Sequence, residues 1–357
     1  MAASGADPLI PPALDRAEQA LRAGRWVKVI AGASNQDLEA IEDLAGIYAL
    51  AGIHCLDVAA DRAVVAAARR GLAWAAARGG HRPWLMVSLS DGEDPHFRKA
   101  WFDPEVCPCD CSRPCERVCP AHAIGEPATG APGVQAAKCY GCGRCLPICP
   151  EGLIEERSQV LGAAAVAAEL AALAPDAVEV HTSLGREGAF AERVQQIVAA
   201  GVPLRRLSVS CGLEGSAPRD RRAPAQLAAT LWQRFATLRR HGLPPLWQLD
   251  GRPMSGDIGT GTAHAAVRLF EQVAAMAPPG PLQLAGGTNA GTGALWLRTD
   301  RRLRLPYCAG VAFGGSARVP LQPWLQQARQ RGLGLLEAPD LWPAALREAR
   351  CLVQSWS

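Results

Sequence analysis

The chain has 357 residues, 49% of them hydrophobic, with 37 lysines and arginines against 34 aspartates and glutamates. A chain of this size can form about two to three domains, or one barrel with an insertion. The net charge of +3 includes no dense basic run, so nucleic acid is not an expected partner. No apolar stretch reaches the roughly 20 residues of a transmembrane segment, and the first residues do not resemble a signal peptide. We therefore expect a soluble cytoplasmic protein.

The first hundred residues predict an N-terminal extension, residues 1–25, followed by the first part of an α/β barrel, residues 26–100. Short apolar runs alternate there with helical patterns at 35–52 and 61–77, which is typical of parallel strands covered by helices. The predicted strands are 26–32, 53–59 and 83–89.

A dense group of cysteines follows the third predicted strand. Nine of the 13 cysteines fall between Cys107 and Cys149, in "CPCDCSRPCERVC" and "CYGCGRCLPICP". Disulfides do not persist in a reducing cytosol, so a dense local set indicates a metal or cluster site. We therefore predict an iron-sulfur insertion over residues 101–156.

The second half of this group has the spacing of a bacterial-type ferredoxin. Cys139, Cys142, Cys145 and Cys149 form a C-x2-C-x2-C-x3-C run followed by proline, which is the run that ligates 4Fe-4S clusters. In two-cluster ferredoxins the last cysteine of such a run ligates the other cluster. We predict that the regular cluster is held by Cys139, Cys142, Cys145 and Cys119.

The upstream half repeats the motif irregularly. Cys115 and Cys119 precede a proline, but Ser112 stands where the standard spacing expects a cysteine. A slightly rebuilt loop and a site with only three irons both fit this departure, so the second cluster is either 4Fe-4S or 3Fe-4S. Its predicted ligands are Cys109, Cys111, Cys115 and Cys149, with Cys107 as a substitute.

Zinc is the competing interpretation of paired cysteines. A single zinc ion takes only four ligands, whereas this segment offers nine cysteines in an order that ends in Cys-Pro. The pattern therefore favours iron-sulfur clusters and predicts one-electron transfer or redox sensing.

The remainder of the chain, residues 157–357, continues the alternation of strands and helices. Five further strands are predicted at 177–183, 206–212, 245–251, 282–288 and 310–316. Helices are predicted at 188–201, 224–242 and 261–277, in an Ala-rich run ending at Ala174, and after Pro339. Eight such units predict a (β/α)8 TIM-like barrel interrupted by a two-cluster ferredoxin domain, with a doubly wound open sheet as the alternative.

In such a barrel the functional face lies at the carboxyl ends of the strands. Polar and charged residues follow several of the predicted strands at this end. The candidates are Ser34, Asn35, Asp57, His181, Thr182, Asp250, Arg252 and Asp257.

Two glycine-containing loops follow the seventh and eighth predicted strands. Barrel loops in these positions commonly hold a phosphate, because glycine lets backbone N–H groups approach an anion closely. The loops therefore predict a phosphate or flavin mononucleotide (FMN) site, with tight turns as the alternative. The candidates are Gly286, Gly287, Thr288, Asn289, Gly314, Gly315 and Ser316.

Four stretches together resemble the cyanobacterial light-dependent period family, LdpA. They are "CPCDCSRPCERVCPAHAI", "KCYGCGRCLPICP", "WVKVIAGASNQDLEAIEDLAGIYALAGIHCLDVAAD" and the segment "QLAGGTNAGT", which is similar to that family's C-terminal domain. The resemblance implies an iron-sulfur protein that reports light or redox state to the circadian clock and adjusts its period. It also implies clock-associated proteins as partners and carries no catalytic residue over to this chain.

Two other functions compete with this regulatory one. The chain could be a ferredoxin-fused, flavin-dependent oxidoreductase with its active site at the barrel mouth. It could also be an electron-transfer or assembly factor for a photosynthetic or respiratory complex. A contact with a quinone or an electron-transport component fits each of these roles, and the regulatory interpretation predicts that the protein is not an enzyme.

Overall fold

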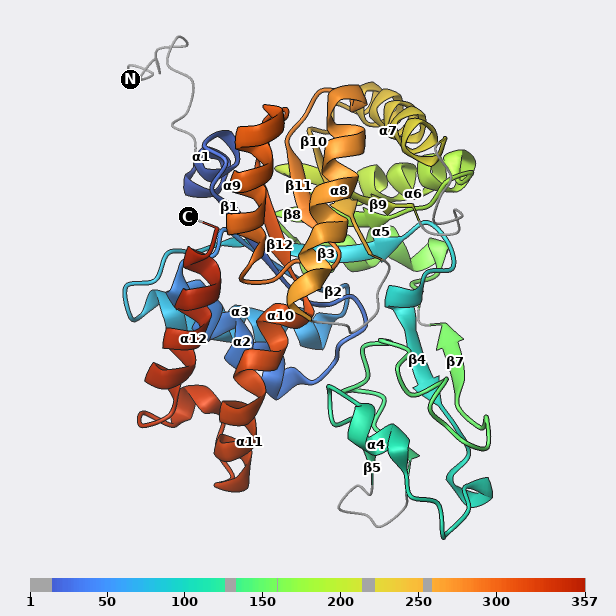
Figure 1. The fold of residues 1–357 in the computed structure, drawn as a ribbon, viewed down its shortest axis with the longest axis vertical. Coiled ribbons are helices and arrows are strands. Elements are labelled where there is room, and N and C mark those ends of the chain that lie inside the picture. Colours follow the sequence, from blue (N-terminus) through green and yellow to red (C-terminus); the bar gives the residue numbers. More distant parts are fainter. Residues whose placement is uncertain (1–14, 126–132, 159, 214–221, 253–258, 357) are drawn as a thin grey trace, which may run out of the picture.

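The computed structural model describes residues 15–125, 133–158, 160–213, 222–252 and 259–356 (Figure 1). Eight parallel strands close into a barrel in the order β1-β12-β11-β10-β9-β8-β3-β2. The strands are β1 (Trp26–Gly32), β2 (Cys55–Ala59), β3 (Trp84–Ser90), β8 (Ala177–His181), β9 (Arg206–Gly212), β10 (Pro245–Asp250), β11 (Leu282–Ala285) and β12 (Gly310–Phe313). The predicted TIM-like barrel is confirmed, and the open-sheet alternative is wrong because β1 pairs with both β2 and β12.

Helices cover the outside of the barrel. The longer ones are α2 (Leu38–Ala51), α3 (Arg62–Ala76), α5 (Ala163–Leu173), α6 (Glu187–Ala199), α7 (Ala223–Arg240), α8 (Ala263–Val273), α9 (Thr292–Leu303), α11 (Gln322–Gln330) and α12 (Trp342–Gln354). Shorter turns are α10 (Gly315–Arg318), η3 (Thr260–Thr262), η4 (Ala274–Met276), η5 (Val319–Leu321) and η6 (Leu335–Glu337). None of the helices that the structure describes is long and apolar enough to cross a bilayer.

Aspartates at strand-to-helix turns begin the first two of these helices. The Asp37 side chain accepts a hydrogen bond from the Ala40 N–H, and the Asp61 side chain accepts from the N–H groups of Ala63 and Val64. These contacts satisfy backbone donors that have no partner within the helix. They fix the loops after β1 and β2, which line the barrel mouth.

The barrel interior is apolar at the amino-terminal ends of the strands and polar toward their carboxyl ends. Trp26, Cys55, Trp84, Met86 and their neighbours fill the amino-terminal end of the strands, which α1 (Arg16–Arg22) covers through its own buried residues. Beyond this layer, toward the barrel mouth, buried polar and charged side chains from several strands point inward. They include Lys28, Asp57, Ser88, Glu179, Ser208, Gln248 and Gln283.

The cysteine-rich insertion leaves the barrel after β3 and returns before β8, as predicted (Figure 1, lower right). Its elements are η1 (Pro95–Phe97), β4 (Arg98–Trp101), η2 (Pro104–Val106), α4 (Pro114–Val118), β5 (Ile124–Gly125), β6 (Gly133–Val134) and β7 (Glu155–Ser158). Strands β4 and β7 pair antiparallel and form the stem of the insertion. The insertion has a small core of its own, built on Ala100, Phe102, Ala123, Ile154 and several cysteines.

Candidate iron-sulfur centres and barrel mouth

Four cysteines line a first cavity of the insertion. Cys119, Cys139, Cys142 and Cys145 face it together with apolar residues such as Ala123 and Ile124. Backbone N–H groups are directed at two of these sulfurs, from Ala100 to Cys139 Sγ at 3.3 Å and from Ala123 to Cys119 Sγ at 3.2 Å. Such donors stabilise the negative charge of cluster sulfurs. The structure thus brings together the four residues predicted for the regular cluster.

A glycine turn lets the first cavity lie close to the stem. Gly141 has a φ of +70°, and a Cβ atom placed there would lie 2.0 Å from the carbonyl oxygen of Arg98. Only glycine allows this approach without displacing β4. The cysteine loop is therefore fitted directly against the strand that joins the insertion to the barrel.

Four other cysteines line a second, separate cavity. They are Cys107, Cys111, Cys115 and Cys149, with Phe102, Leu153 and Ile154 among their neighbours. Cys109, which the sequence prediction placed in this group, is exposed and is not among the residues that line either cavity. The geometry groups Cys107, the predicted substitute, with the other three.

Both cavities fit iron-sulfur clusters. In the first, burial raises the pKa of the Cys145 thiol to about 12, and the thiolates of Cys142, Cys139 and Cys119 add to this effect. Four thiolates can lie this close together only if cations compensate for their charge. Bound iron would supply that positive charge and keep the coordinating thiols deprotonated. Clusters held by these cysteines would supply one-electron transfer.

The first cavity is joined to the barrel through two cationic side chains. Lys99, the residue before Ala100, donates to Gln36 Oε1 and to the Ala136 carbonyl, both at 2.6 Å. On the other side, the Arg318 guanidinium lies 4.1 Å from the centre of the Tyr140 ring and donates to the Ile30 carbonyl. The loops after β1 and β12 are thus in direct contact with the cysteine segment.

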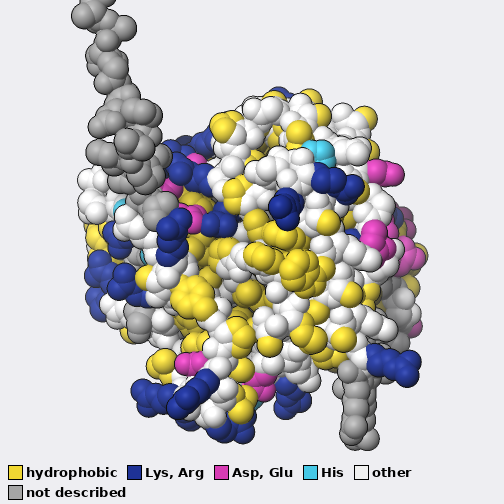
Figure 2. Space-filling view, turned by 90° about the horizontal axis from the view of Figure 1, so that it is seen from above, with side chains coloured by type: hydrophobic (Ala, Val, Ile, Leu, Met, Phe, Trp, Pro, Cys, Tyr) yellow, Lys and Arg dark blue, Asp and Glu magenta, His cyan; other side chains and the backbone are white. Residues whose placement is uncertain are grey.

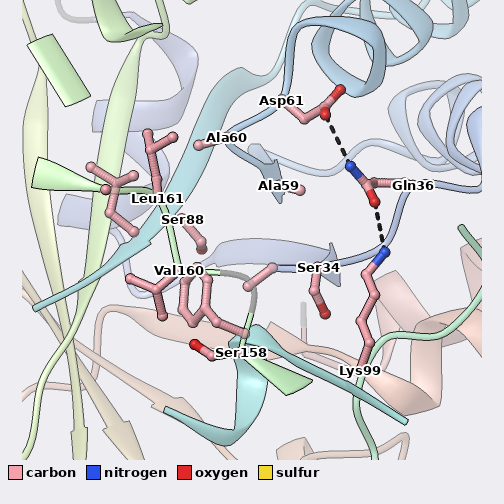
Figure 3. A pocket seen from close by; sticks show the side chains of 14 residues that line it. Ser34, Gln36, Ala59, Ala60, Asp61, Ser88, Lys99, Ser158, Val160 and Leu161 are labelled. Atoms are coloured by element: carbon pink, nitrogen blue, oxygen red, sulfur yellow. Dashed lines mark hydrogen bonds between the residues drawn. The ribbon is translucent and has the colours of Figure 1, made fainter. Parts of the chain in front are cut away.

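A cavity of about 390 Å³ lies between the insertion and the ends of β1, β2 and β3 (Figure 3). Gln36 joins Lys99 to Asp61 across its wall, with Gln36 Nε2 3.0 Å from Asp61 Oδ2. The Ser34 hydroxyl also lines it and is buried without a hydrogen-bond partner among the described residues. The apolar part of the wall includes Phe97, Val160 and Leu161.

A buried lysine organises the charged interior of the barrel. Lys28 Nζ lies 3.2 Å from Asp57 Oδ2 and 2.5 Å from Glu179 Oε2. Burial alone would lower the pKa of Lys28, but these carboxylates outweigh it and raise that pKa. At Asp57 the effect of burial on the pKa is larger than that of Lys28, so the pKa of Asp57 rises to about 6. At Glu179 burial also acts to raise the pKa, but the contacts with Lys28 and His181 outweigh it and hold that pKa low.

Predicted mouth residues His181 and Asp250 belong to the same group. Burial favours neutral imidazole, but the Glu179 contact and the nearby carboxylates raise the pKa of His181 to about 9. Burial raises the pKa of Asp250 to about 7, although the Ser210 hydroxyl donates to its carboxylate. The mouth therefore concentrates buried titratable groups, as functional sites commonly do.

The other mouth candidates lie apart from this group. Asn35 shapes the loop after β1 by bonding to the Ala31 carbonyl and the Asp37 N–H, and Thr182 donates to Asp91. Arg252 packs its backbone against Gly286, and Asp257 lies outside the described residues.

The glycine-containing loops after β11 and β12 pack on one another. A Cβ atom at Gly286 would lie 2.6 Å from the Arg252 carbonyl oxygen, and one at Gly287 would lie 2.8 Å from that of Thr262. Thr288 donates to the Ala312 carbonyl, and Ser316 donates to the Thr288 carbonyl at 2.8 Å. Asn289 donates to the Gly259 carbonyl at 3.1 Å, while Gly314 and Gly315 begin the short turn α10. Tight packing thus accounts for Gly286 and Gly287, and a phosphate or FMN at these loops stays a prediction.

Sequence reasoning missed the partners that complete the barrel interior. Lys28 and Glu179 are single charges within the apolar runs "WVKVIAG" and "AVEVHTS". Gln248 Nε2 donates to Glu179 Oε1 at 3.1 Å, and Ser88 donates to Asp57 at 2.8 Å. An isolated charge within a buried strand is the signal that could have identified Lys28 and Glu179, since such charges are buried only when paired.

Three comparisons place the chain among known proteins. Two family models match: the LdpA Fe-S cluster-binding domain over residues 107–160 and the light dependent period A C-terminal domain over residues 169–355. A curated relative, "Light dependent period A" of Synechococcus elongatus, is 46% identical over 340 residues, which cover 94% of this chain and 92% of that protein.

Two of the solved structures that match share little sequence with this chain. Tryptophan synthase of Mycobacterium tuberculosis is 15% identical with a TM-score of 0.40, covering 94% of this chain and 98% of that one. The carboxyl transferase domain of Rhizobium etli pyruvate carboxylase is 12% identical with a TM-score of 0.43, covering 94% and 50%. The barrel is established by its own strand order. The relative and the two family models, in contrast, identify this chain as an iron-sulfur protein of the light dependent period A family.

Proposed function

We propose that this protein is a redox sensor that relays the light or redox state of the cell to the circadian clock and modulates its period. Electrons would enter through a quinone or an electron-transport component, and clock-associated proteins would receive the signal. The name of the Synechococcus elongatus relative, which refers to a light-dependent period, supports this role.

The observation that carries the proposal is the contact between the first cysteine cavity and the barrel mouth. Lys99 lies next to the residue whose N–H donates to Cys139 Sγ, and Arg318 lies over the ring of Tyr140. A one-electron change at a cluster on these cysteines alters the charge beside both cations. In a partly buried site with low dielectric this change acts strongly on the two cations and on the loops that hold them.

We assign one cluster to Cys119, Cys139, Cys142 and Cys145 and a second to Cys107, Cys111, Cys115 and Cys149, on the grounds of the two cavities. The assignment keeps the crossed arrangement of two-cluster ferredoxins, in which the Cys-Pro cysteine of each half serves the other cluster. Cytoplasmic localisation is part of the same proposal.

A clock reporter strain that carries variants of this gene tests the role. Cys142→Ser removes a ligand of the first cavity, whereas Cys351→Ser changes an exposed cysteine on α12, outside both cavities. We expect Cys142→Ser to abolish the dependence of the period on light intensity and Cys351→Ser to preserve it. A normal light response in Cys142→Ser, with the protein present at wild-type level, would exclude the proposal.

A flavin-dependent oxidoreductase is the second candidate, and the cavity at the barrel mouth favours it. This cavity adjoins Lys99 on one side and the Ser88-Asp57 hydrogen bond on the other, so it lies between the cysteine segment and the titratable interior. The absorbance spectrum of protein purified anaerobically distinguishes the two functions. One flavin bound per chain would favour the oxidoreductase over the redox sensor. No bound flavin after incubation with FMN would exclude the oxidoreductase.

A further inference from the structure

The barrel mouth holds a carboxylate and two imidazoles whose ligand atoms all lie within 4.8 Å of one another. They belong to Asp94, His96 and His181. Asp94 and His96 follow β3, while His181 is the last residue of β8, paired with Ser90 at the end of β3. The barrel register brings these three side chains together, although His181 is far from the other two in the sequence.

The three groups are held in place by their surroundings. Asp94 Oδ1 accepts a hydrogen bond from the His96 backbone N–H at 2.8 Å and lies 2.7 Å from His96 Nδ1. The two imidazole rings have their centres 4.7 Å apart, and the ring of Phe97 packs edge-on against His181. Asp94 and His181 are only 4% and 5% exposed. Little reorganisation is therefore needed for the three side chains to act as one ligand set.

One ring nitrogen of this group is incompletely satisfied. His181 Nε2 is fully buried and lies 3.4 Å from Glu179 Oε1, but it makes no hydrogen bond within the described part of the chain. The neighbouring charges that act on this ring include the carboxylates of Asp94, Glu179 and Asp250. Lys28 already pairs with Glu179, but burying the further carboxylates of Asp94 and Asp250 near an imidazole is costly unless another cation compensates for them.

We propose that Asp94, His96 and His181 bind a divalent transition metal ion, zinc or ferrous iron, at the barrel mouth. Two imidazole nitrogens and one carboxylate oxygen form a ligand set that both ions accept. Three protein ligands leave coordination positions for water or for an exchangeable small ligand. This site is separate from both cysteine cavities and does not depend on the proposed clock function.

The position of the site gives the ion a structural consequence. Asp94 and His96 belong to the turn η1 and its cap, which lead into β4, and the Ala100 N–H of β4 donates to Cys139 Sγ. His181 belongs to the barrel itself. An ion bound by all three residues ties the stem of the insertion to β8. Occupancy therefore couples the first cysteine cavity to the barrel interior.

Equilibrium dialysis of the anaerobically purified, cluster-loaded protein against Zn²⁺ tests the proposal. The first variants are His96→Gln, which keeps the backbone N–H that Asp94 caps, and Asp94→Asn, which keeps the shape of the side chain. His264→Gln, an exposed histidine of α8, is the matched control. Sulfide content equal to that of the wild type shows that each variant has folded and holds its clusters. Zinc-edge X-ray absorption identifies the ligand atoms.

We expect one zinc per chain in the wild type and in His264→Gln, with only nitrogen and oxygen ligands at about 2.0–2.2 Å. In His96→Gln and Asp94→Asn we expect at least a tenfold loss of affinity, roughly the effect of disturbing a metal site. Sulfur ligands at about 2.3 Å would place the zinc on cysteines and overturn the proposal. No bound zinc, or undiminished binding in both variants, would likewise overturn the proposal.

Discussion

Lys28 is the residue that makes the polar interior of the barrel stable. Its ammonium group is fully buried between the carboxylates of Asp57 and Glu179. Removing one partner of a buried ion pair leaves an uncompensated charge, which costs far more than the pair contributes when intact. The effect of losing Lys28 therefore depends on whether Glu179 keeps its charge.

Replacing Lys28 by methionine should destabilise the protein by about 3–5 kcal/mol, because Glu179 is left charged in the interior. The double variant Lys28→Met/Glu179→Gln should lose less than the single variant, since most of the unpaired charge is gone. Thermal unfolding monitored by circular dichroism measures both. A double variant less stable than Lys28→Met would contradict the pairing.

Asp43 on α2 predicts a pH dependence of stability. Its two carboxylate oxygens accept from the N–H groups of Leu335 and Leu336 at 2.9 and 3.0 Å, but burial dominates and raises its pKa from 3.8 to about 6. The folded state therefore binds the proton more tightly than the unfolded state. Stability from this group is present below about pH 4 and is lost as the pH rises to about 6, by roughly 2–3 kcal/mol.

The melting temperature of the wild type minus that of Asp43→Asn isolates this carboxyl from the others that titrate in the same range. We expect the difference to decrease from pH 5 to pH 7 and to stay level above pH 7. A difference that is constant or rises across this interval would show that the carboxyl is not buried as described.

At the residue scale, the sequence predicted the chemistry of the cysteines better than their grouping. The order C-x2-C-x2-C-x3-C fixes the first cavity because its three close cysteines share one turn. Cys107 and Cys109 are two residues apart, and only the path of the chain through η2 decides which of them faces inward. Periodicity does not say which face of a strand points into a barrel, so Lys28 could be recognised only as an isolated charge within an apolar run.

At the scale of elements, Gly141 determines how the cysteine loop meets the stem. Its positive φ and the 2.0 Å approach to the Arg98 carbonyl mean that a methyl group must displace β4 or the loop. Gly152 has a similar φ of +63° but no atom within 4 Å of a Cβ placed there. Comparing alanine substitutions at these two glycines therefore distinguishes the cost of a positive φ from the cost of a steric clash.

Gly141→Ala should therefore lose the cluster of the first cavity and about half of the iron, as measured by iron analysis after anaerobic purification. Gly152→Ala should lose only the roughly 1–2 kcal/mol expected for a left-handed alanine and keep its iron. Equal iron in the two variants would mean that the loop is not packed against the stem as described.

The same scale explains which elements the sequence predicted. All eight strands were predicted because each is an apolar run between turn residues, and β1 and β9 have the predicted bounds. Helix α9 was not predicted, because it follows a glycine-rich loop and has few buried residues. Helix α1 was missed because its position at the amino-terminal end of the barrel comes from tertiary packing on Trp26 and Trp84.

At the scale of the whole molecule, the insertion and the barrel mouth occupy one end, and the opposite end carries a different surface. Helices at the opposite end carry exposed hydrophobic side chains such as Trp232 and Leu297. Figure 2 views the molecule from that end, where hydrophobic side chains gather near the middle and lysines and arginines lie mainly around them. The cysteine-rich insertion thus lies away from this surface.

The proposed chemistry of this protein requires two clusters in two separate cysteine cavities. Iron and sulfide analysis with electron paramagnetic resonance, on anaerobically purified wild type, Cys107→Ser and Cys109→Ser, tests it. We predict about seven to eight irons and two cluster signals in the wild type and in Cys109→Ser, and the loss of one signal with about half the iron in Cys107→Ser. A single cluster in the wild type, or a cluster lost in Cys109→Ser and kept in Cys107→Ser, would contradict it.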